Sequence, residues 1–135
     1  MLAVVDPAVV AAGLVARRGP CMRVLLEFRA GAFDLVTSPT LLDELHALLR
    51  RPAISAYVTD DERAALEAVL SQEATLVDDP PPTETAVGSD PGDEYLLGLA
   101  RAAGARALVS GDPHLATLAS RLPILTPTEF LLSVG

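Results

Sequence analysis

Short apolar runs alternate along the chain with stretches in which apolar residues recur every three or four positions. The runs at 2–5, 33–37 and 107–110 predict buried strands, and shorter runs at 75–77 and 124–125 predict two more. The three-to-four spacing between the runs predicts helices. The predicted helices lie at 8–16, 21–30, 39–50, 60–73, 91–103, 112–119 and 127–132, with a short helix or turn at 53–58.

Proline and capping residues set the boundaries of several predicted helices. Pro7 stands where the first turn of a helix tolerates proline, and Gly19-Pro20 separates the first two helices. Ser38-Pro39 opens the third helix. Thr59 and Glu62 have the spacing of a capping box and start the helix that runs to about residue 73.

Strands that alternate with helices typically form a parallel sheet covered by helices on both faces. We therefore predict an α/β fold: one three-layer α/β/α domain over residues 1–135, Rossmann-like, with a mostly parallel sheet. The stretch 78–89 contains three consecutive prolines and is interpreted as a loop, too short for a domain linker. In such folds functional residues gather where the carboxyl ends of the strands meet.

Two aspartates follow predicted strands at that edge of the sheet. Asp6 comes directly after the first strand, and Asp112 comes just after the strand at 107–110. Both can converge there, although aspartate is also common at such junctions as a turn or N-cap residue.

Two further acids lie on predicted helices. Glu44 is three positions after Leu41 and four before Leu48, at the edge of an apolar stripe. A partly buried carboxylate there is costly unless it is paired or bound to metal, or its long side chain reaches water. Asp93 falls in the first turn of a helix with Asp90 as its predicted N-cap, where the helix dipole favours acids whatever their function.

Four converging carboxylates would repel one another strongly without a cation. A ligand set made only of oxygen atoms suits Mg²⁺ or Mn²⁺, and such an ion can activate a water molecule for attack on phosphorus. His46 and His114 match no zinc-binding spacing, and the single cysteine, Cys21, excludes a disulfide framework and fits a reducing cytosol.

Composition and charge restrict the function classes further. Half of the residues are apolar and 21% are charged, which argues against intrinsic disorder. No apolar run is long enough to span a membrane, and the first residues lack the basic region of a secretory signal, so we expect a cytoplasmic protein. The formal net charge of −8 argues against holding nucleic acid by bulk charge.

Several motifs, in order along nearly the whole chain, resemble the PIN domain family. They are the strand that ends at Asp6, residues 38–45 with Arg51-Pro52, residues 90–100, residues 104–112 and residues 126–131. The segment 90–112 is the most specific of them. The pattern is similar in particular to the small bacterial PIN proteins classed as VapC-like toxins of toxin–antitoxin pairs.

The resemblance implies a Mg²⁺- or Mn²⁺-dependent endoribonuclease, a homodimer, and inhibition by a cognate antitoxin at the active groove. Its four acids would be Asp6, Glu44, Asp93 and Asp112. Asp6, Asp93 and Asp112 would hold the metal, Glu44 would help to ligate it or orient the attacking water, and Ser110 and His114 would support the site. Hydrolysis would leave 5′-phosphate and 3′-hydroxyl ends.

The basic residues are all arginines, whose forked guanidinium groups suit phosphate. Four of them follow helices near the predicted site and are candidate RNA contacts: Arg17, Arg18, Arg50 and Arg51. Eleven acids lie between Asp60 and Glu94, against the single basic residue Arg63. We expect this acidic segment to face away from RNA, while the first half of the chain supplies an arginine rim.

Two departures from the family pattern support a different class of function. Asp6 is followed by Pro7-Ala8, where the family usually has a hydroxyl residue and asparagine, and His114 stands where many relatives have another acid. The alternative is therefore a catalytically impaired PIN-like module that binds antitoxin or RNA without cleavage. A phosphatase or phospho-acceptor site at Asp6 is disfavoured. A haloacid-dehalogenase-type phosphatase would have a second aspartate at the position of Ala8, and a receiver domain would have a lysine near its last strand, whereas this chain contains no lysine.

Overall fold

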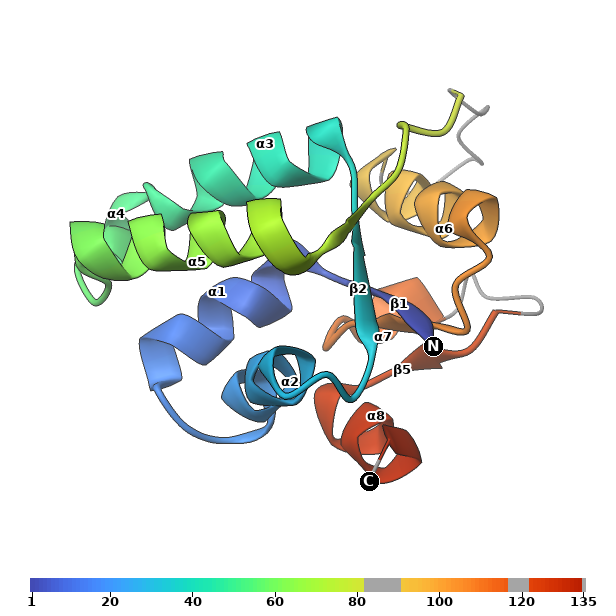
Figure 1. Ribbon diagram of the computed structural model, residues 1–135, viewed down its shortest axis with the longest axis horizontal. Helices are drawn as coiled ribbons and strands as arrows, with labels where there is room; N and C mark the ends of the chain where they lie inside the picture. The colour runs from blue at the N-terminus through green and yellow to red at the C-terminus, as the bar shows by residue number, and fades with distance from the viewer. Residues whose placement is uncertain (82–90, 117–121, 135) are drawn as a thin grey trace.

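The computed structural model describes residues 1–81, 91–116 and 122–134, with the side chains of residues 114 and 116 left out of the description (Figure 1). Within these residues a five-stranded, all-parallel sheet has the order β3-β2-β1-β4-β5. The strands are β1 (Leu2–Val5), β2 (Asp34–Thr37), β3 (Thr75–Leu76), β4 (Ala107–Val109) and β5 (Ile124–Leu125).

Helices connect the strands and cover the sheet. They are α1 (Pro7–Ala16), α2 (Pro20–Arg29), α3 (Pro39–Leu49), α4 (Pro52–Ser55), α5 (Asp60–Glu73), α6 (Pro91–Ala103), α7 (Pro113–Ala116) and α8 (Pro127–Val134). Proline stands at the first or second position of α1, α2, α3 and α4, where its missing N–H costs no helical hydrogen bond.

The central strand β1 separates two hydrophobic cores, because successive side chains on a strand point to opposite faces. Ala3 and Val5 pack into one core, and Val4 packs into the other. Both neighbours of β1 are parallel to it, with Ala3 opposite Leu35 on β2 and Val4 opposite Leu108 on β4. This strand order places the end of β1 at the middle of the carboxyl edge of the sheet.

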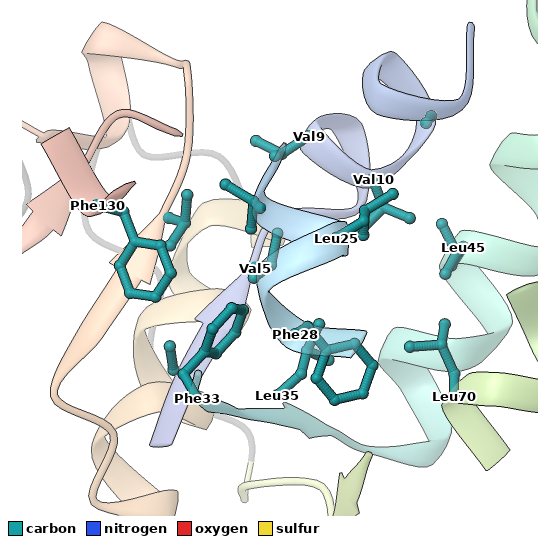
Figure 2. Packing of buried hydrophobic residues seen from close by; sticks show 14 of the residues in the cluster. Val5, Val9, Val10, Leu25, Phe28, Phe33, Leu35, Leu45, Leu70 and Phe130 are labelled. Atoms are coloured by element: carbon teal, nitrogen blue, oxygen red, sulfur yellow. The ribbon is translucent and has the colours of Figure 1, made fainter. Parts of the chain in front are cut away.

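The larger core lies between the sheet and helices α1, α2 and α8 (Figure 2). Phe33 is at its centre: its ring meets Phe130 edge-on at 4.8 Å between centroids and lies 6.0 Å from the ring of Phe28. The second core joins the sheet to α6, through residues such as Leu97 and Leu108. Helices therefore cover both faces of the sheet, and the predicted three-layer α/β/α fold is confirmed.

Helix α3 contributes to both cores and so crosses the carboxyl edge of the sheet. Leu41, in its first turn, packs with the α6 side, whereas Leu45 and Leu49 pack with α1 and α2. This crossing brings the middle of α3, which carries Glu44, close to the end of β1.

The predicted strands and helices are confirmed with boundaries shifted by a few residues at most for the elements described in full. The capping box is present, since the Thr59 side chain accepts from the Glu62 N–H and the Glu62 side chain accepts from the Thr59 N–H. Helix α7 covers only the start of the helix predicted at 112–119, whose remainder lies outside the described residues, as do Asp90 and most of the predicted loop. Among the described helices, none is both long and apolar enough to cross a membrane.

Candidate acidic site at the carboxyl edge of the sheet

Three of the four predicted acids line one hollow of about 400 Å³ at the carboxyl edge of the sheet. Asp6 comes from the end of β1, Glu44 from α3 and Asp93 from the first turn of α6. The remaining lining residues are mostly small or apolar, with one arginine: Pro7, Ala8, Ala47, Leu48, Arg51, Gly92 and Leu96. The hollow therefore combines three carboxylates, from segments far apart in sequence, with one guanidinium group.

Asp6 is held by hydrogen bonds to both of its carboxylate oxygens. It is the N-cap of α1, and its Oδ1 accepts from the Ala8 N–H at 3.0 Å. Its Oδ2 accepts from the Ser110 hydroxyl at 2.9 Å. The Pro7-Ala8 pair brings no polar side chain beside Asp6, yet a backbone N–H and Ser110 orient this carboxylate.

Asp112 is joined to the same group through Ser110. The Asp112 N–H donates to the Ser110 hydroxyl oxygen at 3.1 Å, and Ser110 in turn donates to Asp6. Ser110 is buried and Asp112 is exposed. Asp112 is not among the residues that line the hollow, so it lies beside the other three acids rather than within their pocket.

The predicted partial burial of Glu44 is wrong, because this side chain is exposed. The buried face of α3 runs through Leu41, Leu45 and Leu49. Glu44 is one residue before Leu45 and is therefore turned about 100° away from Leu45, toward the solvent-exposed side of the helix. The spacing from Leu41 and Leu48 suggested a position on the edge of the stripe, but Leu48 is itself only half-buried.

The candidate RNA-binding arginines are in three different places. Arg51 lines the acidic hollow. Arg50 forms an ion pair with Glu67 on α5 at 2.8 Å, and Arg17 forms one with Glu62 on the same helix at 2.9 Å. Arg18 lines a separate hollow at the turn between α1 and α2. Of the four, Arg51 is the arginine that the structure brings to the predicted acids.

His46 does not line this hollow. His46 is exposed, and its Nδ1 lies 3.1 Å from a carboxylate oxygen of Glu67. The side chain of His114 lies outside the described residues.

The donor set of the hollow fits a hard divalent cation. Its ligand atoms are carboxylate oxygens, which Mg²⁺ and Mn²⁺ prefer. Within the described residues, no three histidine, cysteine, aspartate or glutamate side chains are grouped as ligands of one metal ion. Mg²⁺ keeps several of its waters and is usually bound by one or two carboxylates together with substrate phosphate, so the open arrangement remains compatible with it.

A polar cluster that the sequence did not reveal lies next to this site. The Tyr95 hydroxyl on α6 donates to Asp79 Oδ1 at 2.6 Å, and Thr40 on α3 donates to Asp79 through its N–H at 3.1 Å and its hydroxyl at 2.8 Å. Ser38 hydrogen-bonds the Tyr95 hydroxyl and, as N-cap of α3, accepts from the Leu41 N–H. A tyrosine two positions after Asp93 was the only available signal for this cluster.

The cluster shifts the pKa values of its two titratable members in opposite directions. The hydrogen bond from Tyr95, followed by those from Thr40, lowers the pKa of Asp79 to about 2. Partial burial, together with the neighbouring Asp79 carboxylate, raises the pKa of Tyr95 to about 12. At neutral pH the cluster therefore consists of a carboxylate and a protonated phenol.

Residues 3–114 match a family described as PIN domain, a range that includes all four predicted acids and the cluster around Tyr95. No curated protein matches the chain significantly.

Proposed function

Because the chain belongs to the PIN domain family, whose members are generally nucleases, we propose that it is a divalent-metal-dependent endoribonuclease acting on single-stranded or looped RNA. The observation that carries the proposal is the hollow in which Asp6, Glu44 and Asp93 lie beside Arg51. Carboxylates that bind a cation and a guanidinium that binds phosphate are groups suited to metal-dependent phosphodiester hydrolysis.

Mg²⁺ or Mn²⁺ is the proposed cofactor, in keeping with the divalent ions that PIN domains typically use. Asp6, Asp93 and Asp112 would hold it, directly or through water. When bound, such an ion lowers the pKa of a water molecule and offsets the charge that develops on the phosphate oxygens. The hydrogen bonds from Ala8 and Ser110 keep the Asp6 carboxylate turned in one direction for this role.

The remaining residues of the hollow supply positioning and charge. Glu44 accepts a hydrogen bond from the attacking water and directs its oxygen at phosphorus. Arg51 donates to the non-bridging oxygens of the same phosphate, a contact that suits its forked geometry. The new bond joins the water oxygen to phosphorus, and the bond between phosphorus and the 3′ oxygen breaks. The attacking water loses its proton to solvent and the 3′ oxygen takes up a proton, which leaves 5′-phosphate and 3′-hydroxyl ends.

We further propose that the protein is the VapC-like toxin of a bacterial toxin–antitoxin pair. In this proposal it acts in the cytoplasm as a homodimer, and a cognate antitoxin inhibits it at the acidic hollow. The motif order over residues 6–131 supports this part of the proposal.

A PIN-like module that binds antitoxin or RNA without cleavage is the second candidate. It is favoured by Pro7-Ala8, which brings no polar side chain next to Asp6, and by the absence of a three-ligand metal cluster in the described part of the chain. Loss of groups that orient metal ligands typically lowers activity by about 10- to 100-fold. The second candidate therefore differs from the first in whether metal-dependent cleavage is measurable at all.

The experiment is a cleavage assay with labelled RNA in Mg²⁺ and in Mn²⁺, comparing Glu44→Gln with Asp43→Asn. Both substitutions remove one carboxylate from an exposed position of α3, but only Glu44 lines the acidic hollow. We expect Glu44→Gln to lower kcat by about 100-fold or more, as misplacement of a reacting group typically does. Asp43→Asn should keep the wild-type rate.

Equal rates for the two variants would contradict the assignment of Glu44. Absence of cleavage by the wild-type protein in both metals, with RNA still bound, would favour the binding module.

A further inference from the structure

The two helices that carry acids of the hollow belong to different parts of the fold. Helix α3, with Glu44, packs mainly against α1, whereas α6, with Asp93, packs on β1 and β4. They approach each other near their N-terminal ends, where Leu41 of α3 packs into the core beneath α6, so contacts in this region contribute to their relative position.

The polar cluster around Asp79 also joins the two helices in this region. Ser38 and Thr40 belong to the start of α3, and Tyr95 is in the second turn of α6, two residues after Asp93. The Tyr95 hydroxyl has one proton, which it donates to Asp79. In the hydrogen bond between Ser38 and Tyr95, Ser38 is therefore the donor. Both Asp79 oxygens accept from Thr40, which ties this carboxylate to α3 as well as to α6.

Asp79 itself is held by the segment that follows β3. Figure 1 shows this segment rising between the start of α3 and α6. It is anchored to β2 by the hydrogen bond from the Val77 N–H to the Thr37 carbonyl at 2.8 Å. It also lies against α6, because a Cβ added to Gly98 would be 3.7 Å from the Pro80 ring. The carboxylate is thus presented from a fixed piece of backbone.

We propose that Asp79 and Tyr95 are positioning residues that clamp the N-terminal half of α6 to the N-terminal end of α3 and so set the separation of Asp93 and Glu44. The cluster of Ser38, Thr40, Asp79 and Tyr95 acts through these helices and has no contact with RNA. The effect of the clamp on metal binding rests on the proposed function. The clamp itself concerns only how the two helices are held together.

An ordinary stabilising role is the competing explanation for the cluster. A role in stability alone predicts that Tyr95→Phe lowers the free energy of unfolding while the folded protein keeps its helix separation and its metal affinity. The clamp predicts changes in both of these properties of the folded protein.

The helix separation can be measured without metal or RNA. Spin labels at Asp43→Cys on α3 and Ala102→Cys on α6, both exposed positions, report this distance by pulsed electron paramagnetic resonance in a Cys21→Ser background. We expect Tyr95→Phe and Asp79→Asn to broaden the distance distribution. Tyr57→Phe is the matched control, since Tyr57 is the only other tyrosine of the chain and its side chain is exposed.

The consequence for the site is measured by calorimetric titration with Mn²⁺ alone, below the melting temperature of every variant. We expect Tyr95→Phe and Asp79→Asn to raise the Kd for Mn²⁺ by about 10-fold or more, the range for residues that orient ligands. Tyr57→Phe should leave this Kd unchanged.

The two measurements separate the possible failures. An unchanged distance distribution in Tyr95→Phe and Asp79→Asn overturns the clamp, whatever the metal result. A broadened distribution with an unchanged Mn²⁺ Kd also overturns it, because the cluster would then position nothing at the site. If the wild-type protein binds no Mn²⁺ and cleaves no RNA, the proposed function fails, while the distance measurement still judges the clamp.

Discussion

Asp6 is both the N-cap of α1 and one of the acids of the candidate site. It caps α1 through the Ala8 N–H and lies in the hollow with Glu44 and Asp93. Each carboxylate oxygen has two acceptor sites, so the hydrogen bonds from Ala8 and Ser110 leave capacity for a cation. An aspartate after a strand can therefore cap a helix and also belong to a site. In this protein the capping hydrogen bond from the Ala8 N–H orients the Asp6 carboxylate.

Arg50 and Arg51 are adjacent arginines with different surroundings, which makes them a matched pair. We expect Arg51→Ala to weaken RNA binding and to reduce the slope of log Kd against log salt concentration by about 0.7–1, the value for one lost phosphate contact. Arg50→Ala should leave that slope unchanged, because Arg50 already pairs with Glu67. Fluorescence anisotropy with labelled RNA measures the Kd and its salt dependence for each variant, in EDTA to prevent cleavage. Equal slopes for the two variants would show that Arg51 contacts no phosphate.

At the scale of elements, the close packing of α1 on α2 depends on one glycine. Gly13 is buried in α1, and a Cβ at this position would be 3.0 Å from the backbone of Cys21 and Met22 at the start of α2. Backbone atoms cannot move aside as a flexible side chain can. The absence of a side chain at Gly13 thus sets the distance between these two helices.

Gly13→Ala and Gly98→Ala are expected to change stability in opposite directions. Alanine is favoured over glycine in a helix by about 1 kcal/mol, whereas overpacking against rigid atoms costs about 1–3 kcal/mol. Gly13→Ala should therefore destabilise the protein by about 1 kcal/mol. Gly98→Ala, whose Cβ would meet Pro80 at an ordinary 3.7 Å, should stabilise it by up to about 1 kcal/mol.

Urea denaturation of both variants measures these differences. Stabilisation by Gly13→Ala would mean that α1 and α2 pack less tightly than in the structure.

The elements were predictable from sequence because local rules determine them. Apolar runs of four or five residues predicted the longer strands. Ser38 and Thr59 predicted where helices begin, because their side chains accept hydrogen bonds from the backbone of the first turn. The placement of acids at strand ends was predictable for the same reason. The Asp79–Tyr95 contact was not, because a contact between a loop and a helix leaves no periodic pattern. The exposure of Glu44 was not either, because a position at the edge of the apolar stripe is compatible with a buried or an exposed side chain.

For the whole molecule, ion pairs to α5 change the expected distribution of charge. The predicted arginine rim is only partly available, since Arg17 pairs with Glu62, Arg50 with Glu67, and Arg29 with Glu73. Helix α5 is the main acidic element of the described chain, and the arginines of α1, α2 and the end of α3 offset part of its charge. Exposed pairs of this kind contribute little to stability individually, about 0–1 kcal/mol each.

These contacts and the Asp79 cluster predict how stability depends on pH. Tyr95 lowers the pKa of Asp79 to about 2, the Thr59 N–H and Arg17 lower the pKa of Glu62, and Arg50 lowers the pKa of Glu67. Because the unfolded chain has the higher pKa values, it takes up more protons as pH falls. Stability is therefore expected to be constant at neutral pH and to be lost progressively between about pH 5 and pH 2.

Urea unfolding at a series of pH values tests this dependence. Constant or rising stability from pH 5 to pH 3 would contradict the pKa shifts. Asp79→Asn should flatten the lowest part of the curve, since the group with the lowest pKa is then removed.

We propose above that the acids gathered at the carboxyl edge of the sheet support hydrolysis of RNA with a divalent metal. The most direct test is the cleavage of end-labelled RNA by the wild-type protein and by Asp112→Asn in Mn²⁺, with EDTA as control and with analysis of the product ends. We expect 5′-phosphate and 3′-hydroxyl products from the wild-type protein, no cleavage in EDTA, and a loss of about 100-fold or more in Asp112→Asn. Cleavage that persists in EDTA, or that Asp112→Asn leaves unchanged, would contradict this proposal.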